Sequence, residues 1–122
     1  MKLIGDFFDI VSTVSMETDL ICQVRLNPDH YIFRAHFPGN PMTPGVCLVQ
    51  MASELLEERY HRTFRLHTAV NIRFKKPIGN DQLLTFRFTK VTFEGDQAHV
   101  SLSIEDDMTQ CVKMSLKLKI EN

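Results

Sequence analysis

The stretch VCLVQMASELL, residues 46–56, has apolar side chains at eight of its eleven positions. Neither Gly nor Pro interrupts the chain from there to residue 61, so the pattern predicts a helix over about 44–61, with Thr43 as N-cap and Pro44 in the first turn. The apolar positions go most of the way round this helix, whereas a helix on the outside of a sheet keeps a polar face. We therefore expect one long central helix that the rest of the chain wraps around.

The rest of the sequence alternates apolar and polar residues with the period of two that is typical of β-strands. In residues 68–74 this alternation predicts that Val70, Ile72 and Phe74 face inward. The expected strands cover residues 8–15, 19–26, 68–74, 83–93, 98–104 and 111–120, with turns at 78–81 and 94–96. An antiparallel sheet of five or six strands wrapped around the helix, an α+β arrangement, satisfies both patterns. No linker or repeat divides residues 1–122, so we expect one domain.

Composition excludes several classes of protein. Of the 122 residues, 43% are hydrophobic and 24% charged, which is typical of a globular chain. The net charge of -1 argues against nucleic acid as a partner, because nucleic-acid-binding proteins usually have a basic excess. Cys22, Cys47 and Cys111 lack the spacing of a zinc site, so we expect neither a metal nor a cofactor. The longest apolar run, Val46–Val49, is far too short to span a membrane, and we expect a cytoplasmic protein.

Residues 36–46 read His-Phe-Pro-Gly-Asn-Pro-Met-Thr-Pro-Gly-Val. This segment resembles the β-hydroxyacyl-acyl-carrier-protein dehydratases, whose pattern His-Phe-Pro-Gly-x-Pro-x-x-Pro-Gly-Val it matches at every fixed position. Residues 74–83 also resemble that family's strand and turn ending in Gly-Asp-x-Leu, with Asn80 in place of the glycine and a turn one residue shorter. The resemblance covers residues 8–120 and implies a hot-dog fold and the removal of water from a 3-hydroxyacyl thioester.

The resemblance implies that His36 is the base that removes the α-proton of the substrate. An imidazole, with an ordinary pKa of about 6.5, suits proton transfer near neutral pH. Gly45 lies in the first turn of the expected helix, where N–H groups lack internal partners, so we expect its N–H to stabilise the thioester oxygen. Phe37, Pro44, Gly45 and Val46 are the expected substrate-binding residues. The alternatives are a surface histidine and a glycine that only fits its turn.

Gln50 departs from the family, whose pattern implies a glutamate or aspartate at this position, facing the histidine of a second subunit. A glutamine can hydrogen-bond a hydroxyl but cannot transfer a proton, and general acid–base help is typically worth ~10²–10⁴ in rate. Glu54 lies four residues on, on the same helix face, where the family often has glutamine. We therefore expect Gln50 and Glu54 to belong to the catalytic site. The alternatives are a hydrogen-bonded core position for Gln50 and a solvated or salt-bridged one for Glu54.

Three function classes follow from the sequence. The first is a (3R)-hydroxyacyl-[acyl-carrier-protein] dehydratase of fatty acid or related lipid or polyene synthesis, acting on a thioester of acyl carrier protein or coenzyme A. The others are a hot-dog acyl thioesterase and a non-catalytic acyl-binding or partner subunit. Because carrier proteins are acidic, we expect docking on the cations Arg34, Arg73, Lys75 and Lys76. The family's shared site implies at least a homodimer, with three dimers together as the larger alternative.

Overall fold

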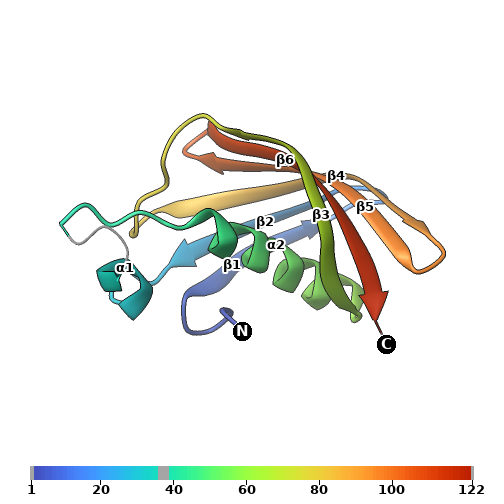
Figure 1. Cartoon of the computed structure of the whole chain (residues 1–122), viewed down its shortest axis with the longest axis horizontal. Coiled ribbons are helices and arrows are strands. Elements are labelled where there is room, and N and C mark those ends of the chain that lie inside the picture. Colours follow the sequence, from blue (N-terminus) through green and yellow to red (C-terminus); the bar gives the residue numbers. More distant parts are fainter. Residues whose placement is uncertain (1, 36–38, 122) are drawn as a thin grey trace.

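The computed structural model describes residues 2–35 and 39–121 of the chain. In this part of the chain, six strands form one antiparallel sheet in the order β1-β2-β4-β5-β6-β3 (Figure 1). The elements, in chain order, are β1 (Phe8–Ser15), β2 (Leu20–Leu26), α1 (Tyr31–Ala35), α2 (Gly45–Tyr60), β3 (Thr63–Phe74), β4 (Leu83–Glu94), β5 (Gln97–Asp106) and β6 (Thr109–Glu121). Neither of these helices is long and apolar enough to cross a membrane.

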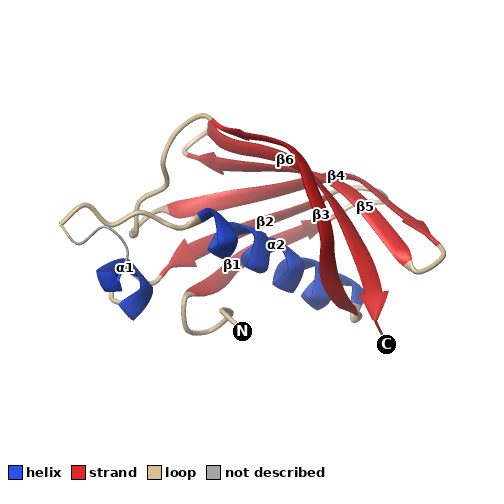
Figure 2. Cartoon of the chain, in the orientation of Figure 1, coloured by secondary structure: helices blue, strands red, loops and turns tan. Residues whose placement is uncertain are grey.

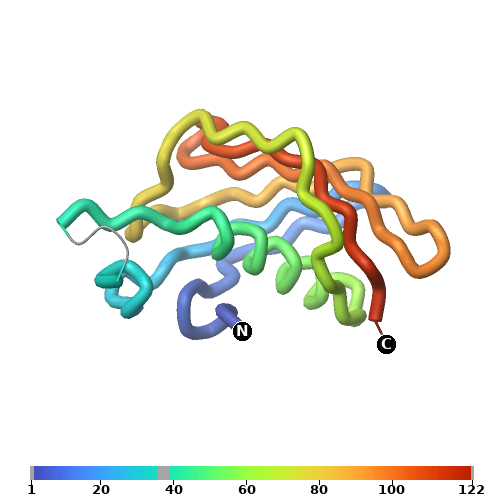
Figure 3. Tube along the Cα trace, viewed as in Figure 1, coloured from blue at the N-terminus to red at the C-terminus, as the bar shows by residue number. Residues whose placement is uncertain are grey.

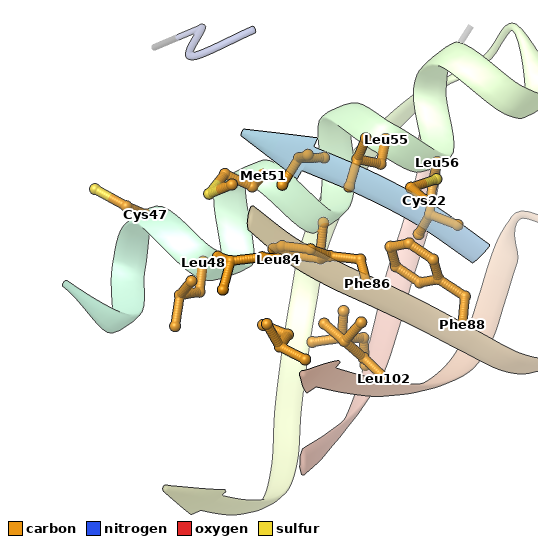
Figure 4. Close-up of a cluster of buried hydrophobic side chains, with 14 of the residues drawn as sticks. Cys22, Cys47, Leu48, Met51, Leu55, Leu56, Leu84, Phe86, Phe88 and Leu102 are labelled. Carbon is orange, nitrogen blue, oxygen red and sulfur yellow. The ribbon is translucent and has the colours of Figure 1, made fainter. Parts of the chain in front are cut away.

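The sheet curves around α2, which lies along its concave face (Figure 2). Leu48, Met51 and Leu55 of α2 pack toward Leu84 and Phe86 of the central strand β4, and all five side chains are at most 2% exposed (Figure 4). Burial on most sides of α2 explains why its sequence lacks a polar face over residues 47–56. The predicted architecture of an antiparallel sheet around one central helix is therefore confirmed.

The start of α2 differs from the sequence prediction. The helix has 16 residues and is short rather than long. Thr43 does not cap it: its hydroxyl donates a hydrogen bond to the carbonyl of Gly79 at 2.7 Å, and its N–H donates to the carbonyl of Ile78 at 2.7 Å. Pro44, in extended backbone, occupies the N-cap position instead, without a side-chain hydrogen bond. Thr43 is thus paired with the turn at 78–79, and α2 begins two residues later, at Gly45.

The prediction that Val70, Ile72 and Phe74 of β3 face inward is wrong. These side chains are 46%, 43% and 63% exposed. β3 is an edge strand that pairs with β6, and its register shifts between Leu66 and Thr68 and again between Val70 and Arg73. Asn71 and Arg73, which alternate with these residues, are exposed as well, so neither face of β3 is covered over residues 70–74 of the single chain. The apolar side chains at the end of this edge strand therefore lie on the surface.

Candidate active site

His36 and Phe37, the predicted base and one predicted substrate contact, lie outside the described residues, as does Pro38. The other predicted catalytic residues, Gly45, Gln50 and Glu54, all lie on α2. The described part of the site therefore consists of this helix and the segments that contact it.

A pocket of about 390 Å³ opens at the N-terminus of α2. Pro44, Gly45 and Leu48 line it on the helix side, and Phe74, Lys75, Lys76, Pro77 and Ile78 belong to its lining from β3 and the following turn. The first N–H groups of a helix lack acceptors within it and carry a partial positive charge, which favours a partly negative oxygen such as that of a polarised thioester. A pocket with this helix end in its wall can receive a carbonyl group.

Gly45 is the one helix residue whose lack of a side chain matters for this pocket. A Cβ built on Gly45 would lie 3.1 Å from Cζ of Phe74, closer than an ordinary contact. The absent side chain allows the helix backbone to approach the Phe74 ring at the pocket wall. The sequence predicted Pro44 and Gly45 as substrate-binding residues, and the structure brings both to this pocket.

Val46 and Gln50 open instead onto a second hollow of about 360 Å³, between α2 and β3. Val49 and Ser53 line the same hollow from α2, and Leu66 lines it from β3. Gly45 and Gln50 are five residues apart, a rise of roughly 7.5 Å along the helix. The predicted site residues of one chain thus divide between two hollows on neighbouring parts of one helix.

Gln50 and Glu54 are in direct contact. Nε2 of Gln50 donates a hydrogen bond to Oε2 of Glu54 at 2.8 Å. The Glu54 carboxylate, only 3% exposed, also accepts the N–H of Leu3 on Oε2 and Oε1, at 2.8 and 3.0 Å, and the N–H of Ile4 on Oε1 at 2.7 Å. The spacing of four residues predicted a shared helix face for Gln50 and Glu54. The two backbone donors were missed, since no local pattern links residues some fifty positions apart.

The N-terminal segment, residues 2–7, supplies those donors by folding back against α2 (Figure 3). Leu3 and Phe7 are 2% and 0% exposed, so apolar burial holds the segment in place. Asp6 contacts the buried His30, whose Nε2 lies 3.2 Å from Oδ2 of Asp6, and Nδ1 of His30 accepts the N–H of Ile32 at 3.1 Å. The N-terminal segment therefore contacts both the Glu54 carboxylate on α2 and His30, the residue just before α1.

Residues 12–115 match the family model of the ApeI-like proteins, described as ApeI dehydratase. The chain belongs to the ApeI-like dehydratase family. Among known proteins, it is similar to the 3-hydroxyacyl-[acyl-carrier-protein] dehydratase FabZ of Lactobacillus helveticus (strain DPC 4571), with 22% identity over 122 residues. The alignment covers 95% of this chain and 74% of that relative. The predicted resemblance to these dehydratases is thus confirmed at the level of the family.

Solved structures confirm the hot-dog fold of this ApeI-like chain. A chain of the dehydratase heterocomplex ApeI:P from Xenorhabdus doucetiae aligns with a TM-score of 0.74 at 16% identity, over 90% of this chain and 96% of that one. A hypothetical thioesterase from Streptococcus pneumoniae TIGR4, solved with coenzyme A, aligns with a TM-score of 0.64 at 11% identity, over 98% and 92% of the two chains. Identities this low establish a shared fold alone.

The predicted docking cations of the ApeI-like chain are not all in one place. Lys75 and Lys76 follow β3 and line the pocket beside Gly45. Arg73 lies in β3 opposite Lys113 of β6. Arg34, in α1, lines a separate hollow. The structure therefore brings two of the four predicted cations to the pocket at the start of α2.

Cys47, in the first turn of α2, is the thiol nearest to Gly45 in the sequence, but it is not an activated nucleophile. It is 3% exposed, and burial raises its pKa, which disfavours the reactive thiolate. Burial also raises the pKa of Cys22, to about 11. Among the described residues, no group of three His, Cys, Asp or Glu side chains is placed to hold a metal ion.

Proposed function

We propose that this ApeI-like protein removes water from (3R)-hydroxyacyl thioesters in fatty acid or related lipid or polyene synthesis. The observation that supports this most strongly is the pocket at the N-terminus of α2, where Gly45 meets Phe74 without a side chain of its own. Membership of a dehydratase family supports the class of reaction. The substrate thioester would enter this pocket with its carbonyl oxygen at the start of the helix.

In the proposed reaction His36 removes the α-proton, and the electron pair of that C–H bond moves toward the thioester carbonyl. The Gly45 N–H and the positive end of α2 stabilise the negative charge that develops on the carbonyl oxygen. The electrons then return to form the double bond between the α- and β-carbons, and the bond to the β-hydroxyl breaks. His36 gives its proton to the departing hydroxyl, so that water leaves and the imidazole is neutral again. Gln50 lines a different hollow from Gly45 in its own chain, so in this proposal it orients the hydroxyl of a substrate held at the pocket of the second subunit.

The protein acts, in this proposal, as at least a homodimer. β3 is a long edge strand, and Leu66, Val70, Ile72 and Phe74 along it are 40% to 63% exposed, while Val46 on α2 is 69% exposed. Exposed apolar residues on an unpaired strand edge are typical of an interface. The relative from X. doucetiae is described as a heterocomplex, so a different hot-dog chain is the alternative partner.

We further propose that an acidic acyl carrier protein delivers the substrate to Lys75 and Lys76, with Arg73 and Arg34 on the surrounding surface. A carrier-bound acyl chain must enter beside the point where its carrier docks, and both lysines line the pocket. Coenzyme A, whose phosphates are also anionic, is the alternative carrier.

The experiment that tests the function incubates the purified protein with 3-hydroxyacyl and enoyl thioesters of a carrier protein and of coenzyme A. The enoyl product is followed by its conjugated absorbance, and free thiol is followed in parallel. Enoyl formation without thiol release supports the dehydratase. Thiol release identifies a thioesterase instead, and binding with neither product identifies an acyl-binding or partner subunit.

A further inference from the structure

Glu54 is a buried carboxylate, and both of its oxygens accept hydrogen bonds from this chain. Oε1 accepts the N–H of Ile4, Oε2 accepts Nε2 of Gln50, and the one N–H of Leu3 is shared between the two oxygens. Three donors of the chain thus occupy the carboxylate, which is only 3% exposed and so is shielded from a substrate hydroxyl. This arrangement favours an indirect role for Glu54, through the residues that it holds.

The contact with Glu54 determines how the carboxamide of Gln50 is oriented. Oxygen and nitrogen of an amide are assigned from their hydrogen-bond partners, and a carboxylate that already accepts two backbone N–H groups pairs with the NH₂ group. Nε2 of Gln50 therefore lies against Glu54, 2.8 Å from Oε2, and Oε1 lies on the side of the carboxamide away from it. The acceptor atom, rather than the donor, is thus the one directed away from the buried carboxylate.

We infer that Glu54 is a positioning residue, which holds Gln50 so that its Oε1 accepts the hydrogen bond of the substrate's β-hydroxyl. A hydroxyl that donates its proton to Oε1 keeps its oxygen lone pairs available for the proton that must arrive as water departs. The inference rests on the proposed function and deepens it: the carboxamide orients the leaving group, and the N-terminal segment, through Glu54, fixes the carboxamide. Substrates that bear a β-hydroxyl are thereby distinguished from acyl chains without one.

The first test is a nuclear magnetic resonance measurement on the protein labelled with ¹⁵N in glutamine side chains. The Nε2 protons of Gln50, assigned from their loss in Gln50→Glu, are expected to exchange with water much more slowly than those of free glutamine. Glu54→Gln should remove this protection. Glu58→Gln, an exposed position one turn further along α2, is the matched control and should leave it unchanged. Exchange as fast as in free glutamine would overturn the inference without any activity measurement.

The second test is kinetic. Glu54→Gln is expected to lower kcat for dehydration by about tenfold, the worth of one hydrogen bond, with KM within about twofold of the original. The double variant Gln50→Glu/Glu54→Gln keeps one carboxylate and one carboxamide in contact and should recover activity relative to Glu54→Gln alone. If Glu54→Gln folds as the parent does and retains its kcat, Glu54 is only structural and the inference is wrong.

Binding separates this inference from the proposed function. A 3-hydroxyacyl thioester should shift the Gln50 side-chain resonances of the parent protein, and the corresponding acyl thioester without a hydroxyl should shift them less. This holds whether or not the protein turns the substrate over. If the protein forms enoyl product but both ligands shift the resonances equally, the dehydratase function is supported and the role of Oε1 is refuted. If the shifts are unequal but no product forms, the role of Oε1 is supported and the dehydratase function is refuted.

Discussion

Gln50 stands where the resemblance to the dehydratases implies an acid, and in the proposed function this changes what the site can do with a proton. A carboxamide can hold a hydroxyl but cannot protonate it, so both proton transfers of the proposed reaction fall to His36. In this proposal Glu54 does not act as the acid, because its oxygens already accept the N–H groups of Leu3 and Ile4 and the amide of Gln50. At the scale of residues, the proposed chemistry therefore depends on one imidazole, one helix N–H and one oriented amide.

His36→Ala is expected to abolish enoyl formation, because the proposed mechanism has no second base. The loss should be at least the ~10²–10⁴ that general acid–base catalysis typically provides. His99→Ala, at an exposed position on β5, is the matched control and should retain the parent rate. The measurement is the initial rate of absorbance change with a 3-hydroxyacyl thioester. An unchanged rate in His36→Ala would contradict the dehydratase proposal and favour a binding or partner subunit.

Gln50→Glu is expected to raise the dehydration rate by restoring a group that can donate a proton, by up to ~10²–10⁴. The introduced carboxyl would stand against the Glu54 carboxylate, and two carboxyls in contact resist losing both protons, so its pKa should lie above the usual value for glutamate. Protonation is what a donor needs, so the gain should be largest at low pH and disappear as the pH rises through that pKa.

The pH profile of kcat, from about pH 5 to 9, measures this effect against the parent enzyme. A gain that does not vary with pH would show that the introduced group does not act as an acid. A lower rate in Gln50→Glu, together with complete loss in Glu54→Gln, would instead assign the proton transfer to Glu54.

At the scale of elements, the sequence predicts those helices and strands whose burial leaves a periodic pattern of apolar residues. The absence of a polar face on α2 and the alternation in β4, β5 and β6 follow from burial on one sheet face, and these elements lie where the patterns predict. The exposure of β3 cannot be predicted in this way, because its place at the sheet edge and its irregular register depend on how it pairs with β6, which a local pattern does not show. The contact of Glu54 with Leu3 lies beyond any local pattern, since chain folding alone brings these residues together.

The exposed side chains of β3 lead to a prediction about assembly. Val70→Lys should weaken self-association, because burial of the exposed half of this side chain is worth ~0.7–1.5 kcal/mol in each copy, or roughly 10–10² in the dissociation constant of a dimer. Val70 is already 46% exposed in the single chain, so the thermal stability of the monomer should change little. Val11→Lys on β1, the other edge strand, is the matched control, at a position 50% exposed.

Sedimentation across a range of protein concentrations would measure both dissociation constants. A parent protein that is monomeric at micromolar concentration would refute the homodimer. Equal weakening by Val70→Lys and Val11→Lys would place the interface elsewhere.

At the scale of the whole molecule, charge is balanced overall but not locally. The net charge is -1, whereas Arg73, Lys75 and Lys76 follow one another closely at the end of β3, and Lys113 lies opposite Arg73. Like charges directly opposite each other on paired strands destabilise a sheet. An acidic partner would relieve this repulsion, and the same surface adjoins the pocket at the start of α2. Carrier docking and substrate entry would then occupy one end of the molecule.

Lys75→Glu/Lys76→Glu is expected to slow turnover of carrier-bound substrate while sparing a short thioester analogue that needs no docking. The loss should lie in kcat/KM and shrink as salt is added, because exposed charges interact over a Debye length of only about 10 Å at 0.1 M ionic strength. Lys90→Glu/Lys119→Glu reverses the same number of charges at exposed positions on β4 and β6, and it should leave both rates unchanged. Equal losses on the carrier-bound and short substrates would contradict docking at Lys75 and Lys76 and assign these lysines to the pocket itself.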